Sequence, residues 1–246
     1  MLSLIGSLCQ FRNAYNELIL NGMEMTPVLY TSRLELHPLQ LADAEQVQPL
    51  FGIWEIVKNL NRNVPWPYPP DGANTFYRDV ALPAIARGEQ WAWTIRLKEE
   101  PGRIIGGIGL TKNETDNRGF WMGLPWQGRG YMTEAADAVT DFWFYQLKHP
   151  VLRVSKCASN LASRRVSVKQ GMRLIATTER DYVCGRMPAE IWEITADEWR
   201  ENRLYPALDP AARPHPRGRP AHPGRDRGPL RPDPHFTQRV RPPVSR

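Results

Sequence analysis

The chain has 246 residues, of which 41% are hydrophobic and 24% are charged. These fractions are typical of one or two globular domains, and they exclude a coiled coil and an intrinsically disordered chain. The formal net charge is +6, but nine Arg against three Asp in residues 205–246 account for all of it, so residues 1–204 are neutral overall. Because a nucleic-acid surface needs its Lys and Arg on the folded part, we expect no DNA or RNA partner.

The cysteines and the apolar runs indicate the compartment. Cys9, Cys157 and Cys184 are too few and too far apart for a disulfide framework or a CxxC pair, which predicts a reducing compartment. No apolar run approaches the roughly 20 residues that span a bilayer, and the first nine residues lack the features of a signal peptide. We therefore expect a cytoplasmic protein with no membrane partner.

Composition divides the chain into three segments. Residues 1–25 form an N-terminal extension, residues 26–204 form one domain, and residues 205–246 form a tail. The tail contains eleven Pro and nine Arg and few apolar residues, so we expect it to be disordered. The sequence leaves open whether both terminal segments belong to the native protein, and whether the domain forms a homodimer.

The first half of the domain begins with a strand and then becomes helical. Residues 31–39 alternate apolar and polar side chains, which predicts a half-buried strand. Apolar residues recur at helical spacing over residues 41–54 and predict a first helix. Residues 74–87 predict a second helical region, interrupted at Pro83. Three strands of a meander follow, at residues 90–97, 103–111 and 117–124.

The second half alternates helices and strands. A helix is predicted over residues 131–147, and a short one over residues 161–170 that ends at Gly171. Strands are predicted at residues 151–158, 173–178 and 190–195. Together these elements predict an α+β fold, a single domain with a mixed, mostly antiparallel central sheet flanked by helices.

A glycine-containing loop joins a predicted strand to a predicted helix. Gly128 and Gly130 allow positive φ and close approach, so that backbone N–H groups of the loop and the helix N-terminus can converge on a phosphate. A dinucleotide fingerprint requires a third glycine where this chain has Thr133, and a P-loop requires Lys before Ser or Thr where it has Arg129 and Gly130. The spacing therefore excludes both of these phosphate sites.

Five motifs in order resemble the GNAT superfamily of N-acetyltransferases, in particular the branch of ribosomal-protein N-terminal acetyltransferases. They lie at residues 31–44 (TSRLELHPL, then DA), 104–110 (IIGGIGL), 119–135 (GFWMG, then QGRGYMTEA), 160–166 (NLASRRV) and 171–173 (GMR). The resemblance covers about residues 28–201 and implies that acetyl-CoA donates an acetyl group to a primary amine, on a protein N-terminus or a small molecule.

The resemblance also implies a coenzyme site. Backbone amides of residues 127–133 would hold the pyrophosphate, and a splayed pair of strands, residues 119–124 and 151–158, would expose N–H groups to the pantetheine arm. Asn160 and Ser163 would approach the pantetheine and its sulfur, although Asn160 is also an ordinary helix N-cap. The residues expected to bind the cosubstrate are Trp121, Met122, Gln127, Gly128, Arg129, Gly130, Tyr131, Met132, Thr133, Asn160 and Ser163.

The chemical roles are less specified. Direct attack of an amine on a thioester mainly needs alignment of the reactants, a route for the amine proton and an acid for the departing thiolate. Ser163 is the predicted acid. The general base is open: Glu114 and Asp116 are candidates, water is another, and Glu134 is expected to stabilise the start of a helix instead. Trp66 and Tyr68 are the predicted acceptor contacts.

Other functions are less well supported. Outside the tail, His37 and His149 are the only histidines, and neither HExxH nor G-x-S-x-G occurs, so we expect no metal site and no serine hydrolase. Two alternatives remain. The domain could be a non-catalytic acyl-CoA-binding regulator, or the Arg-rich tail could make it a nucleic-acid accessory protein, whose affinity would depend on salt.

Overall fold

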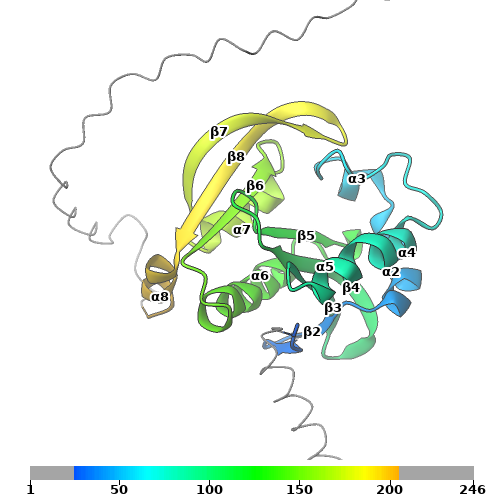
Figure 1. The fold of residues 1–246 in the computed structure, drawn as a ribbon, viewed down its shortest axis with the longest axis horizontal. Coiled ribbons are helices and arrows are strands. Elements are labelled where there is room, and N and C mark those ends of the chain that lie inside the picture. The colour runs from blue at the N-terminus through cyan, green and yellow to red at the C-terminus, as the bar shows by residue number, and fades with distance from the viewer. Residues whose placement is uncertain (1–24, 205–246) are drawn as a thin grey trace, which may run out of the picture. The chain divides into compact units, whose positions relative to one another are not determined.

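The computed structural model describes residues 25–204, so the predicted tail and all but one residue of the predicted N-terminal extension lie outside the described residues. Two sheets with helices around them make up this part of the chain (Figure 1). The first sheet has the order β1 (Leu29–Tyr30), β2 (Leu34–Pro38), β3 (Gln90–Leu97), β4 (Glu100–Thr111) and β5 (Arg118–Met122). The second has the order β6 (Val151–Cys157), β8 (Gly185–Thr195) and β7 (Arg173–Tyr182).

The α+β prediction is confirmed, and the central sheet is divided. Every strand pair within the two sheets is antiparallel. No helix within residues 25–204 has the length and apolar character needed to cross a membrane.

Helices cover both faces of the first sheet, which explains the nearly continuous apolar sequence of β3. Its side chains alternate between the two faces; Trp91 and Trp93 on one face are at most 1% exposed, and Thr94 on the other is 1% exposed. Trp91 and Trp93 contact the ring of Phe142 edge-on, with centroid distances of 6.3 and 5.5 Å. Burial of these large side chains fixes the register of β3 in the sheet.

The helices before β3 are shorter than the periodicity predicts. They are η1 (Leu41–Asp43), α2 (Ala44–Phe51), α3 (Trp54–Val57), α4 (Gly72–Phe76), η2 (Tyr77–Ala81) and α5 (Leu82–Ala86). The predicted first helix breaks because Ile53 is extended, with φ −111° and ψ 133°. Pro83 stands in the first turn of α5, directly after the π turn η2, which accommodates the missing N–H of proline within a continuous helical path.

The later helices agree with the sequence except for η3 and the last one, which were not predicted. They are η3 (Leu124–Trp126), α6 (Tyr131–Asp141), η4 (Phe142–Gln146), α7 (Leu161–Lys169) and α8 (Ala196–Leu204). Gly171 ends α7 in the left-handed region, at φ 72°. The sequence analysis missed α8 because most of its side chains are charged; a single tryptophan, Trp199, is 2% exposed and anchors it.

Strands β7 and β8 form a hairpin that is longer than predicted and curves over one end of the domain (Figure 1). Residues 173–179 are exposed on both faces, so they lack the alternation from which a strand is recognised.

A gap separates the two sheets between β5 and β6. The strands begin side by side, where Asn117 N donates to Arg153 O at 2.7 Å and Arg153 N donates to Asn117 Oδ1 at 2.8 Å. One residue earlier, Asp116 Oδ1 accepts from Ser155 N at 3.0 Å. No ladder joins β5 to β6 beyond this point. The splayed strand pair that the resemblance implied is therefore present.

Candidate active site

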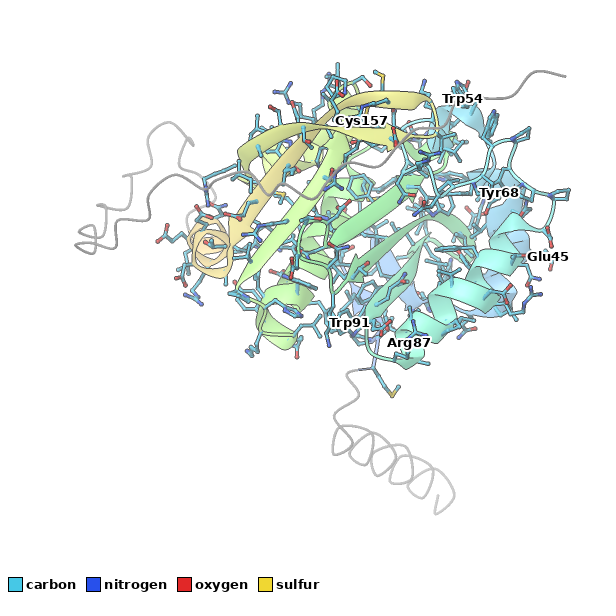
Figure 2. The ribbon with its side chains drawn as sticks, turned by 45° about the horizontal axis from the view of Figure 1, so that its top comes forward. Glu45, Trp54, Tyr68, Arg87, Trp91 and Cys157 are labelled. Carbon is cyan, nitrogen blue, oxygen red and sulfur yellow. The ribbon has the colours of Figure 1, made fainter. Side chains whose placement is uncertain are left out.

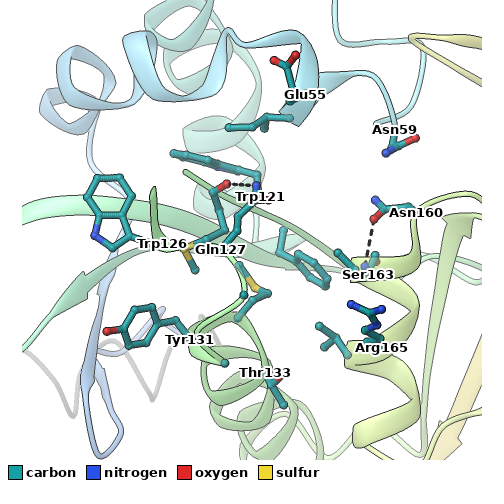
Figure 3. A pocket seen from close by; sticks show the side chains of 18 of the residues that line it. Glu55, Asn59, Trp121, Trp126, Gln127, Tyr131, Thr133, Asn160, Ser163 and Arg165 are labelled. Carbon is teal, nitrogen blue, oxygen red and sulfur yellow. Dashed lines mark hydrogen bonds between the residues drawn. The ribbon is translucent and has the colours of Figure 1, made fainter. Parts of the chain in front are cut away.

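A cavity of about 320 Å³ lies between the loop before α6, strand β5 and the first turns of α7. Figure 3 shows Trp126 and Tyr131 toward one end of it, and Asn160, Ser163 and Arg165 toward the other. Its volume is in the range typical of small-molecule sites. The predicted residues that line it are Trp121, Met122, Gln127, Gly128, Gly130, Tyr131, Met132, Thr133, Asn160 and Ser163.

The loop at one end of the cavity is built to receive an anion. Gly128 and Gly130 have φ of 75° and 83°, and a Cβ at Gly128 would have no atom within 4 Å. Gly130 is the N-cap residue of α6, and no described side chain caps this helix. Its first amides are thus available to a ligand, and the helix dipole adds partial positive charge there.

A polar cluster holds this loop in place. Glu134 Oε1 accepts from Thr31 Oγ1 at 2.6 Å, Ser32 Oγ at 2.9 Å and Arg33 N at 2.8 Å, and Arg33 forms an ion pair with Glu134 Oε2 at 2.7 Å. Arg33 Nη1 also donates to the Arg129 carbonyl at 3.2 Å. Although burial alone would raise the pKa of Glu134, these hydrogen bonds lower it to about 2. Glu134 therefore has a structural role, as expected, but it acts through contacts with residues 31–33 and not only by stabilising the start of its helix.

Strand β5 forms one wall of the cavity through Trp121 and Met122. The Trp121 ring contacts Phe51 edge-on, with a centroid distance of 5.4 Å. It lies across β4 at Gly107, where an added Cβ would be 2.6 Å from Trp121 Nε1, so this position requires glycine. Gln127 Nε2 donates to the Met122 carbonyl at 2.8 Å and ties the loop to the end of the strand.

At the other end, the start of α7 presents Ser163. Asn160 is the N-cap residue and accepts from Ser163 N at 3.1 Å (Figure 3). Lys156 of β6 is 5% exposed, and its Nζ lies 3.4 Å from Ser163 Oγ and 2.6 Å from Ser167 Oγ. Burial, helped by the nearby positive charge of Arg118, lowers the pKa of Lys156 to about 7.

A second cavity of about 150 Å³ lies in the gap between the sheets. It shares five lining residues with the first cavity: Asn59, Leu60, Phe120, Asn160 and Ser163. Its other walls include Asp116, Arg118, Lys156 and Tyr182. The Tyr182 hydroxyl is buried, and burial raises its pKa to about 12. The two cavities thus meet at Ser163.

Arg129, Trp66 and Tyr68 lie outside both cavities. Arg129 contributes its carbonyl to the contact with Arg33. Trp66 is 45% exposed and packs on Trp54 with a centroid distance of 5.1 Å. The Tyr68 ring occupies the space above Gly52 and Gly72 and contacts Phe51, which places it against the helices that Figure 2 shows on this side of the domain. The acceptor contacts predicted for Trp66 and Tyr68 stay predictions.

The structure does not bring Glu114 to Ser163. Glu114 is exposed in the turn after β4, and its carbonyl accepts from Arg153 Nη1 at 3.2 Å. It borders a different hollow, beside Trp143 and His149. Asp116, the other carboxylate considered in this turn, lines the second cavity together with Ser163.

Several cavity residues were not predicted. Ala162, Arg165, Val166 and Lys169 all line the first cavity from α7. Their three- and four-residue spacing places them on one face of the helix, and this periodicity could have revealed them. Glu55 and Asn59 reach the cavity from α3 and the segment after it, and their sequence carries no comparable signal.

Comparison with known proteins agrees with the motifs. The family model described as acetyltransferase (GNAT) domain matches residues 33–173, which is more than half of the chain. The chain belongs to the GNAT acetyltransferase family. It is an acetyl-CoA-dependent acetyltransferase, as the motifs predicted.

Solved structures of ribosomal-protein acetyltransferases and of RimJ share the fold. RimL, a ribosomal L7/L12 alpha-N-protein acetyltransferase in complex with coenzyme A, is 16% identical, with 71% of this chain and 99% of that chain covered and a TM-score of 0.59. RimJ of Mycobacterium smegmatis, in complex with CoA-disulfide, is 17% identical over 70% and 89%, with a TM-score of 0.61. The ribosomal-protein-S5-alanine acetyltransferase of Vibrio fischeri is 14% identical over 70% and 98%, with a TM-score of 0.60.

Proposed function

We propose that this GNAT domain, residues 26–204, transfers the acetyl group of acetyl-CoA to a primary amine by direct attack on the thioester. The observation that supports it best is the first cavity, which runs from the uncapped N-terminus of α6 to Ser163 in the gap between β5 and β6. An anion site at one end and a polar side chain at the other match the two ends of the pyrophosphate and pantetheine portion of the cosubstrate.

In this proposal, residues 127–133 bind the pyrophosphate through their amides, and Trp121 and Met122 line the pantetheine arm. Arg165 and Lys169, on the cavity face of α7, add positive charge for phosphate groups. Acetyl-CoA supplies the activated acetyl group, and the protein supplies position and charge.

The reaction itself needs few groups. Ser163 donates a proton to the departing sulfur, and the amine enters through the second cavity, which meets the first at Ser163. Of the two candidate carboxylates, Asp116 is the one that we propose to bind the acceptor amine, because Asp116 lines that cavity and Glu114 does not. Asp116 Oδ1 accepts a hydrogen bond from Ser155 N, which leaves Oδ2 for the acceptor amine. Arg180 Nη1 lies 3.8 Å from this Oδ2.

The acceptor class follows the family branch that the motifs resemble. We propose a protein N-terminus or a small amine as the acceptor and the cytoplasm as the site of action, with no membrane or nucleic-acid partner and with a homodimer left open. The name of the structural neighbour RimL supports a protein N-terminus as the acceptor, and that of ribosomal-protein-S5-alanine acetyltransferase supports a peptide with a free N-terminal alanine as the first probe.

The decisive experiment compares Gly128→Ala with Gly88→Ala. Both glycines have positive φ, 75° and 67°, and at both an added Cβ has no atom within 4 Å, so each substitution should cost a similar 1–2 kcal/mol or so of backbone strain. Of the two added methyl groups, only the one at position 128 would occupy the space where the pyrophosphate approaches the loop. Calorimetric titration with acetyl-CoA should therefore show at least tenfold weaker binding for Gly128→Ala and unchanged binding for Gly88→Ala.

Release of CoA in the presence of the alanine peptide, followed with a thiol reagent, tests transfer itself. Asp116→Asn should raise KM for the peptide, and Glu114→Gln, two residues away and outside the cavity, should not. Equal binding of acetyl-CoA by both glycine variants would refute the phosphate site. Tight binding without CoA release, whatever amine is offered, would favour the non-catalytic acyl-CoA regulator instead.

A further inference from the structure

Lys156 is a buried lysine for which the proposed mechanism has no role. It is 5% exposed, and no described carboxylate forms an ion pair with it. Its Nζ instead lies among acceptors of α7: Ser167 Oγ at 2.6 Å, Ser163 O at 3.2 Å and Ser163 Oγ at 3.4 Å. Burying an ammonium without a counter-ion is costly, which makes a purely structural function for it unfavourable.

Charged and titratable groups from four elements surround Lys156, and two of them, Arg180 and Tyr182 of β7, line the same cavity. Arg118 faces it from β5 and Asp116 from the turn before that strand, while Glu190 is its cross-strand partner on β8. Burial and Arg118 disfavour the ammonium form, whereas Asp116 and Glu190 favour it. With a pKa of about 7, the group can change its charge near neutral pH, unlike an ordinary lysine.

The position of Lys156 relative to the cavities decides what this charge can do. Lys156 lines the second cavity beside Ser163, and Ser163 lines both cavities. A hydroxyl is a weak acid, and it donates to a departing thiolate more readily when a cation stands behind it to replace the proton. We propose that Lys156 is a positioning residue that orients Ser163 and replaces the proton that Ser163 gives to the CoA sulfur.

This inference rests on the proposed function, and its proton balance is simple. As the amine nitrogen bonds to the acetyl carbon and the carbon–sulfur bond breaks, the electron pair remains on sulfur. Ser163 Oγ donates its proton to the sulfur and takes one from Lys156 Nζ. The acceptor nitrogen loses one proton on forming the amide, and this proton, carried by solvent, recharges Lys156. The products are the amide and the CoA thiol.

The kinetic test uses the full-length chain, acetyl-CoA and the N-terminal alanine peptide. Lys156→Met should lower kcat about a hundredfold, within the usual range for a lost proton donor, and should leave the Kd of acetyl-CoA within twofold. In the wild type, kcat should fall as the pH rises through the pKa of Lys156, and this alkaline limb should vanish in Lys156→Met. Lys98→Met, at an exposed residue after β3, is the control and should change neither quantity.

Ser167→Ala provides a second variant that retains the lysine. Loss of an acceptor for the ammonium should lower the pKa of Lys156 and move the alkaline limb to lower pH. If Lys156 had only a structural role, Ser167→Ala would leave the pH of this limb unchanged.

Carbon-13 NMR of the lysine side chains gives a readout that needs no acceptor. The Lys156 Cε signal should titrate near neutral pH in the free protein, at lower pH in Ser167→Ala, and at higher pH when CoA is bound. Desulfo-CoA, which lacks the sulfur, should not move the Cε titration to higher pH.

The outcomes separate the two proposals. A wild type that neither binds acetyl-CoA nor releases CoA overturns the proposed function and this inference with it. Normal kcat in Lys156→Met, an unmoved limb in Ser167→Ala, or the same Cε midpoint with CoA and desulfo-CoA overturns the role of Lys156 alone.

Discussion

The Glu134 cluster permits a quantitative prediction of how stability depends on pH. Hydrogen bonds from Thr31, Ser32 and Arg33 lower the pKa of Glu134 from an ordinary 4.5 to about 2, and the carboxylate is 16% exposed. A difference of about 2.5 pH units corresponds to about 3 kcal/mol of unfolding free energy. Because Arg33 is 48% exposed and partly screened by solvent, we expect about 2 kcal/mol for the change Glu134→Gln at pH 7.

The sign follows from the direction of the shift. Since the folded-state pKa is depressed, the stabilisation is complete above the unfolded-state pKa of 4.5 and is lost as the pH falls toward 2. Urea unfolding of the wild type and Glu134→Gln, followed by circular dichroism, should show a difference near 2 kcal/mol at pH 7 that shrinks steadily below pH 5. Glu99→Gln, at an exposed turn residue, should match the wild type at every pH. A difference below about 0.5 kcal/mol at pH 7, or one independent of pH, would contradict the reasoning.

Three further predictions concern single contacts. Arg96→Met should destabilise the fold by about 3 kcal/mol in urea, because it leaves Asp43, its partner at 2.8 Å, buried and unpaired, and adding Asp43→Asn should restore part of the loss. Asn160→Ala should cost about 1 kcal/mol by removing the cap on the Ser163 amide, whereas Asn160→Asp should keep the melting temperature. Removal of residues 205–246 should leave steady-state CoA release unchanged; a lower rate would place part of the site in the tail.

The sequence predicted those parts of the molecule whose signals are local. Alternation located β2, and the glycine pair located the loop before α6, because the backbone there needs positive φ. Local signals failed where tertiary contacts decide the structure. The charged helix α8 depends on one buried tryptophan, Trp199, and the exposed strand β7 depends on its pairing with β8.

The same contrast holds for the candidate site. Ten of the eleven predicted cosubstrate residues line the first cavity, since they belong to contiguous motifs. Lys156 was missed because lysine is ordinarily an exposed residue, although this one shares the buried face of β6 with Leu152 and Val154. Only the fold reveals Ser163 and Ser167 beside it. Glu114 and Asp116 could not be ranked from sequence, because two residues in one turn end beside different cavities.

The gap between β5 and β6 also bears on aggregation. It leaves two strand edges facing each other without a ladder, and an unpaired edge invites either closure within the molecule or strand addition from another copy. Strand β5 is only five residues long, and Arg118 and the ammonium form of Lys156 place two like charges across the opening. Short edges and inward-pointing charges are devices by which sheets resist such pairing. The residues that keep this edge available to a ligand therefore also disfavour aggregation by strand addition from another copy.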